Sequence, residues 1–194
     1  MAEFVPNNGV RRGVPWRIIG WGGAVLLLAA PFVAMQMNAA GVDWTLDDFI
    51  FAGLLLGVIG GAFELAVRLS PNRTYRRGAA LALLGTLLVI WSNLAVGIVG
   101  SEHNPANQWF FAALLVGIGG GCIARFRAKG MALATAATAL SLWIAFAIAV
   151  ISPTDEPFVK HSVELAGTSL FALLFLGSAA LFRRAAFDQE AIRS

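Results

Sequence analysis

Charged residues are scarce in this sequence, and cysteine, histidine and tyrosine are scarcer still. Only 13% of the 194 residues are charged, whereas 58% are hydrophobic. A soluble domain averages about 25% charged and about 45–50% apolar residues. A water-soluble fold of this composition would have to expose large apolar patches. The scarcity of charge therefore excludes a soluble globular domain and predicts an integral membrane protein.

The few reactive side chains also restrict the chemistry. Cys122 is the single cysteine, so no intramolecular disulfide can form. His103 and His161 are the only histidines that could bind a haem, and both lie at the edges of apolar segments. No phosphate-binding loop and no set of nucleophile, acid and base can be assembled. The sequence therefore predicts a protein that is not an enzyme, and it identifies no cofactor.

Long apolar segments occupy most of the chain. A bilayer core of about 30 Å needs roughly twenty apolar residues in a helix, because lipid offers no hydrogen-bond partners to the backbone. Six segments meet this condition: residues 17–37, 48–68, 78–99, 108–125, 130–151 and 164–182. We expect an all-α six-helix transmembrane domain over residues 16–186, with polar segments at 1–15 and 187–194.

The basic residues are sorted to one set of loops. Thirteen of the fourteen arginines and lysines lie there, and Lys160 alone lies in the other set, which is acidic. By the positive-inside rule the basic side is cytoplasmic, so both ends of the sequence are predicted to be cytoplasmic in an inner (plasma) membrane of bacterial type. The pI near 9.8 does not indicate nucleic-acid binding, because the basic residues form short clusters between apolar segments.

An internal repeat is also visible. At a spacing of 60 residues, Gly57, Gly60 and Gly61 match Gly117, Gly120 and Gly121, and at a spacing of 52, Trp91 matches Trp143. The repeating unit is a helical hairpin, and the three hairpins (about 17–69, 77–126 and 129–184) run in the same orientation. The alternative is that helices rich in leucine, alanine and glycine resemble one another by composition alone.

Small residues form two matching stripes at helical spacing. Such stripes allow helix backbones to approach closely, so we expect them to pack against other helices. Their members are Gly53, Gly57 and Gly61 in the second segment and Ala113, Gly117 and Gly121 in the fourth.

Two polar residues within the apolar segments are candidates for function. Glu64 lies four residues before Arg68, which favours an interfacial ion pair over a proton-handling role. Asn93 is the most notable uncharged polar residue of the third segment. We expect it to form an interhelical hydrogen bond, with ligand contact as the alternative.

The acidic loops contain the candidate metal ligands. The repeat spacings place Asp43, His103 and Asp155 at corresponding positions, and His161 and Glu164 lie three residues apart at the start of the sixth segment. Histidine and carboxylates suit zinc, manganese or iron. Acidic outer loops are also the ordinary complement of a basic cytoplasmic face, and that alternative needs no metal.

These observations favour a non-catalytic subunit or accessory protein of a membrane assembly, with the bilayer, other membrane subunits or further copies of itself as partners. A small transporter or channel built from parallel repeats is the alternative. A metal- or haem-binding protein that faces the periplasm is a weaker one.

Overall fold

The computed structural model describes residues 16–152 and 160–191. These residues form six α-helices and one short 3-10 helix: α1 (Trp16–Gln36), α2 (Leu46–Leu69), α3 (Arg73–Ala95), η1 (Pro105–Asn107), α4 (Gln108–Ile123), α5 (Ala128–Ile151) and α6 (His161–Ala191). Six helical segments are long and apolar enough to cross a membrane, and the fourth of them, Pro105–Ile123, consists of η1 and α4 together. The predicted fold class of an all-helical protein with six candidate membrane spans is thus confirmed.

The chain divides into two compact units at Gly60, within α2. The N-terminal unit contains α1 and the larger part of α2. In this unit the indole ring of Trp21 on α1 lies over Gly60 of α2, where an added Cβ would be 3.0 Å from the ring. The C-terminal unit contains the end of α2 and helices α3 to α6.

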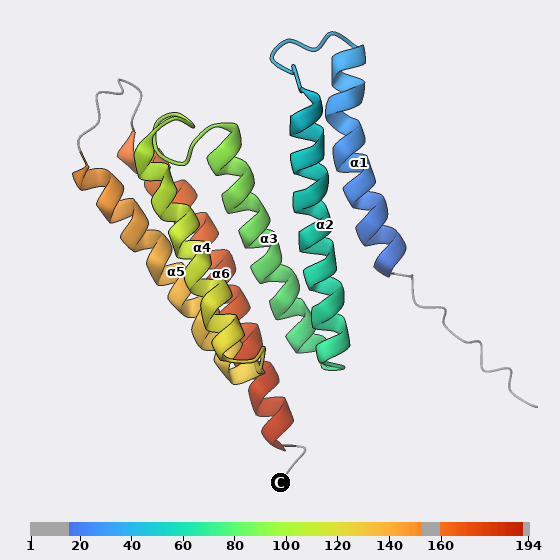
Figure 1. Cartoon of the computed structure of the whole chain (residues 1–194). Helices are drawn as coiled ribbons and strands as arrows, with labels where there is room; N and C mark the ends of the chain where they lie inside the picture. The colour runs from blue at the N-terminus through green and yellow to red at the C-terminus, as the bar shows by residue number, and fades with distance from the viewer. Residues whose placement is uncertain (1–15, 153–159, 192–194) are drawn as a thin grey trace, which may run out of the picture. The chain divides into compact units, whose positions relative to one another are not determined.

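Within the C-terminal unit, α6 is the central helix. It packs against α3 on one side and α5 on the other, and α5 packs in turn against α4 (Figure 1). Helices α3 and α4 make few contacts with each other. The segment 77–126 therefore does not pack as a close hairpin, whereas α5 and α6 do.

Small residues let α3 and α6 approach closely. The Phe182 ring lies over Gly78, and the Ser178 hydroxyl donates a hydrogen bond of 2.8 Å to the Gly78 carbonyl. A larger residue at position 78 would separate the two helices.

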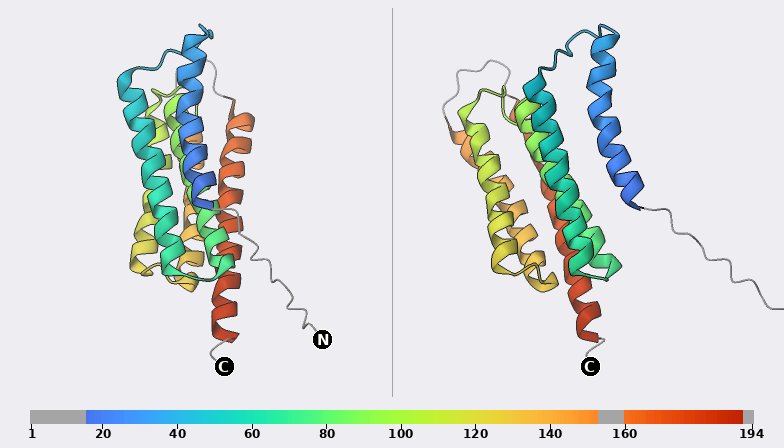
Figure 2. Two further views of the ribbon diagram at one scale, coloured as in Figure 1. Left: turned by 90° about the vertical axis from the view of Figure 1, so that its right-hand side faces the viewer. Right: turned by 45° about the vertical axis from the view of Figure 1, so that its right-hand side comes forward.

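Two helices differ from their predicted bounds. Helix α3 begins early because the side chain of Asn72 accepts hydrogen bonds from the backbone N–H groups of Thr74 and Tyr75, which caps the helix. It ends at Ala95, before the predicted end at 99, because Gly97 adopts a φ of 75°. Helix α6 continues past 182 to Ala191 and extends beyond the ends of α4 and α5 (Figure 2). Its extension contains good helix formers, and Ala185 is buried against α3 and α5 side chains.

Candidate functional site

The loop between α3 and η1 folds back onto the helices. Val99, at its centre, is 1% exposed and belongs to the apolar core with Phe110 and Leu142. The turn depends on Gly97, because a Cβ at this position would collide with the backbone of Ser101. A side chain would also be strained by the positive φ. The loop is therefore an ordered part of the C-terminal unit.

Asn107 holds this loop from the inside. Its Oδ1 accepts hydrogen bonds from the backbone N–H groups of Ile98 (3.2 Å) and Val99 (3.0 Å). Its Nδ2 donates to the carbonyls of Val99 (3.2 Å) and Ser101 (2.7 Å). An asparagine amide offers two donors and two acceptor lone pairs, so every hydrogen-bonding position of this side chain is used. The side chain is 4% exposed, which makes these bonds costly to lose.

Asn93 connects α3 to the same cluster. Its Nδ2 donates a 2.9 Å hydrogen bond to the carbonyl of Asn107, and the residue is 2% exposed. The hydrogen bond expected of Asn93 is thus present, although its acceptor is the carbonyl just before α4. The Oδ1 of Asn93 has no partner among the residues that the structure describes.

Glu164 connects α6 to the cluster. It is 8% exposed, its Oε1 accepts a hydrogen bond of 3.2 Å from the Gly100 N–H, and its Oε2 lies 3.1 Å from His161 Nδ1. One turn further along α6, the hydroxyl of Thr168 is completely buried and has no partner within the described part of the chain. We name Asn93, Asn107, Glu164 and His161, with residues 96–104, the polar cluster.

The buried side chains of the polar cluster mainly hold the loop backbone in place. Both carboxylate oxygens of Glu164 are engaged, one by a backbone N–H and one by an imidazole. The Asn107 amide is saturated by the loop backbone. The exposed side chains of Glu102 and His103 lie at the tip of the loop, with His103 Nδ1 at 3.4 Å from Glu102 Oε1.

The predicted metal ligands are placed as follows. Asp43 is exposed in the N-terminal unit, His103 is exposed in the C-terminal unit, and Asp155 lies outside the described residues. His161 and Glu164 do lie side by side. Among residues 16–152 and 160–191, no three histidine, cysteine or acidic side chains are grouped to hold a metal ion. The predicted cluster that includes Asp155 stays a prediction.

The predicted ion pair of Glu64 is present, with Oε2 at 3.7 Å from the Arg68 guanidinium. Arg68 is largely exposed, and an exposed pair of this kind contributes at most about 1 kcal/mol.

The two small-residue stripes differ in their surroundings. In α4, Ala113 is buried, a Cβ at Gly117 would collide with the hydroxyl of Thr138 on α5, and one at Gly121 would lie 3.3 Å from the sulfur of Met131. This stripe packs closely against α5.

In α2, a Cβ at Gly53 would lie 3.9 Å from Leu28, and one at Gly57 or Gly61 would meet no atom within 4 Å. The glycine of α2 that a neighbouring side chain covers is instead Gly60, outside the stripe, where the Trp21 ring lies. The packing role of Gly57 and Gly61 stays a prediction.

Asn107 and Gly97 were missed as candidates by the sequence interpretation. The segment Asn104-Pro105-Ala106-Asn107 contains the signal that could have found the turn, because asparagine before proline marks a helix start. Asn104 does cap η1, through a 2.9 Å bond from the Ala106 N–H to its Oδ1. No protein-family model, curated protein or solved structure matches this chain.

Proposed function

We propose that this protein is a non-catalytic subunit or accessory protein of a membrane assembly and that it presents the loop 96–104 to a protein partner. One observation carries this proposal: the buried polar groups Asn107 and Glu164 bond to the backbone of the loop, while Glu102 and His103 at its tip are exposed. A preorganised loop loses little conformational entropy on binding, which favours recognition.

The orientation is part of the same proposal. The basic residues lie at the ends of α2, α4 and α6 and at the starts of the odd-numbered helices, whereas the loop 96–104 lies at the opposite ends. The positive-inside rule supports a cytoplasmic location for the basic ends in a bacterial-type inner membrane. The loop would then face the periplasm. The matching glycines and tryptophans support an origin of the three consecutive helix pairs by duplication.

The test is affinity purification from native membranes in mild detergent. We expect one protein to copurify near stoichiometrically with the parent and to be lost from the double variant Glu102→Ala/His103→Ala. Both side chains are exposed, so the fold should be unchanged. The matched control is Asp43→Ala/Asp47→Ala, which removes two exposed acids from the N-terminal unit and should retain the partner.

Coexpression of two differently tagged copies distinguishes a heteromeric partner from a homo-oligomer. A parent that purifies alone, or a partner retained by the loop variant, would contradict the proposal. A hydrolytic or transport activity that disappears in Glu164→Gln without loss of stability would contradict the non-catalytic assignment.

A further inference from the structure

A groove between α5 and α6 opens at the basic end of the C-terminal unit. It has a volume of about 560 Å³, within the range of small-molecule sites. Alanines form much of its wall, among them Ala132 and Ala136 of α5 and Ala179 and Ala180 of α6. Because alanine side chains are short, two packed helices leave an apolar channel between their outer faces here.

Two cations lie at the mouth of the groove. Lys129 belongs to the first turn of α5, and Arg183 lies on the final turns of α6. The Arg183 guanidinium lies 5.7 Å from the centroid of the Phe187 ring, a cation–π contact that holds it at the rim. No carboxylate of the described residues forms an ion pair with either cation. Glu190 also lines the groove and is the one acid there.

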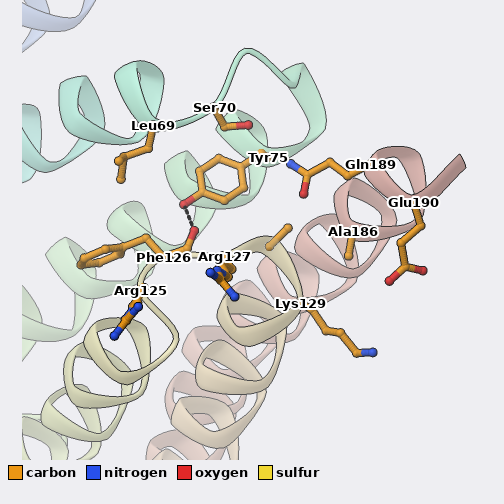
Figure 3. A pocket seen from close by; sticks show the side chains of 11 residues that line it. Leu69, Ser70, Tyr75, Arg125, Phe126, Arg127, Lys129, Ala186, Gln189 and Glu190 are labelled. Carbon is orange, nitrogen blue, oxygen red and sulfur yellow. Dashed lines mark hydrogen bonds between the residues drawn. The ribbon is translucent and has the colours of Figure 1, made fainter. Parts of the chain in front are cut away.

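A second, polar cavity adjoins the groove. It has a volume of about 520 Å³ and shares Lys129, Ala186 and Glu190 with the groove. Arg125 and Arg127 add two further cations from the turn between α4 and α5 (Figure 3).

This turn is held in place by Tyr75, whose hydroxyl donates a 2.7 Å hydrogen bond to the Phe126 carbonyl (Figure 3). Arg125 and Phe126 both adopt positive φ angles, of 49° and 55°. The chain therefore makes a tight turn here without glycine, and the hydrogen bond from Tyr75 fixes the backbone of Phe126, the residue between Arg125 and Arg127 in the sequence.

We propose that the groove and the adjoining cavity bind an anionic glycerophospholipid. One acyl chain lies along the alanine groove, and the phosphate lies between Lys129 and Arg183, with the rest of the headgroup toward Arg125 and Arg127. Basic pockets between helices at a membrane surface suit anionic headgroups. A free phosphate would use the cations and leave the apolar groove without a role. A zwitterionic lipid would bring its own cation next to four others.

The test measures the thermal stability of the purified, delipidated protein in neutral detergent. The probes are phosphatidylglycerol, phosphatidylcholine and inorganic phosphate. We expect saturable stabilisation by phosphatidylglycerol and by neither of the other two. Each cation should contribute about fivefold to the affinity, so Lys129→Gln/Arg183→Gln should weaken binding about 25-fold. The charge-matched control is Arg73→Gln/Arg77→Gln, which alters the exposed start of α3 and should bind like the parent.

A variant that fills the groove, Ala136→Trp, tests the acyl-chain site separately. It should abolish the stabilisation of the protein by phosphatidylglycerol without a change in charge. A phosphatidylglycerol with a diazirine in its acyl chain gives an independent measurement on the parent, and we expect it to label α5 and α6 within residues 132–136 and 179–183. Equal stabilisation by phosphate would replace the lipid with a free anion, and equal stabilisation by phosphatidylcholine would remove the role of charge. Equally weakened phosphatidylglycerol binding in the control variant Arg73→Gln/Arg77→Gln would also overturn the proposal. So would diazirine labelling that is confined to helices other than α5 and α6.

Discussion

The replacement Asn107→Ala in η1 should destabilise the C-terminal unit more than Asn104→Ala, the asparagine replacement within the loop. It removes four hydrogen bonds, two to backbone N–H groups and two to backbone carbonyls of the loop. A hydrogen bond contributes about 1 kcal/mol net, so the expected loss in free energy of unfolding is about 4 kcal/mol. Val99 is almost completely buried, so water cannot readily replace its lost partners.

The matched control is Asn104→Ala, at the end of the loop that Asn107 holds. This side chain accepts one hydrogen bond, from the Ala106 N–H, so its removal should cost about 1 kcal/mol. In a protein of this length, 1 kcal/mol corresponds to about 2–4 °C in the melting temperature. We therefore expect a decrease of about 8–16 °C for Asn107→Ala and about 2–4 °C for Asn104→Ala, measured as thermal denaturation in detergent followed by size-exclusion chromatography.

A second variant separates hydrogen bonding from shape. Asn107→Asp keeps the size and both acceptor positions but loses the two donors and places a charge in a buried site. We expect it to be at least as destabilising as Asn107→Ala. If Asn107→Ala melts no lower than Asn104→Ala, the argument that this side chain holds the loop is refuted.

Three further experiments test the orientation and the packing. In a cysteine-free background, Asp43→Cys should react with an impermeant thiol reagent in intact cells and Pro71→Cys should not, because the basic loops are predicted to be cytoplasmic; the reverse labelling would invert the orientation. Gly117→Leu should overpack the contact with α5 and lower the melting temperature by the equivalent of about 1–3 kcal/mol. Its control is Gly119→Leu, where a Cβ meets open space, and this variant should melt like the parent. Equal melting of the two variants would place the stripe on a lipid-facing surface. Ser178→Ala should lower the free energy of unfolding by about 0.6 kcal/mol, the average for a hydrogen bond between membrane helices. An unchanged melting temperature in detergent would show that the hydrogen bond from Ser178 to α3 does not stabilise the unit.

Helix packing in the C-terminal unit was only partly predictable. The small-residue stripe of α4 was recognisable because Ala113, Gly117 and Gly121 recur every four residues. The sequence did not show that this stripe would pack against α5. The repeat suggested hairpins, yet α3 packs on α6 and only slightly on α4.

The contacts of the polar residues were also only partly predictable from the sequence. Local spacing predicted the pair of Glu64 and Arg68, because residues four apart on a helix are neighbours. The same reasoning placed His161 beside Glu164. It could not show that Glu164 accepts a hydrogen bond from Gly100, because that contact joins residues 64 positions apart.

What the sequence by itself determined was the class of the protein and the helices that can span a membrane, because segment length and hydropathy are local properties that the thickness of a bilayer constrains. It also determined the sorting of cations to one set of loops. Only the tertiary structure decided which helices pack together, where α3 ends, and that Asn107 uses all its hydrogen-bonding positions on the loop before η1. These features depend on contacts between residues distant in the chain, and in a membrane such contacts are selected by shape and hydrogen bonding, because hydrophobicity does not distinguish one apolar helix face from another.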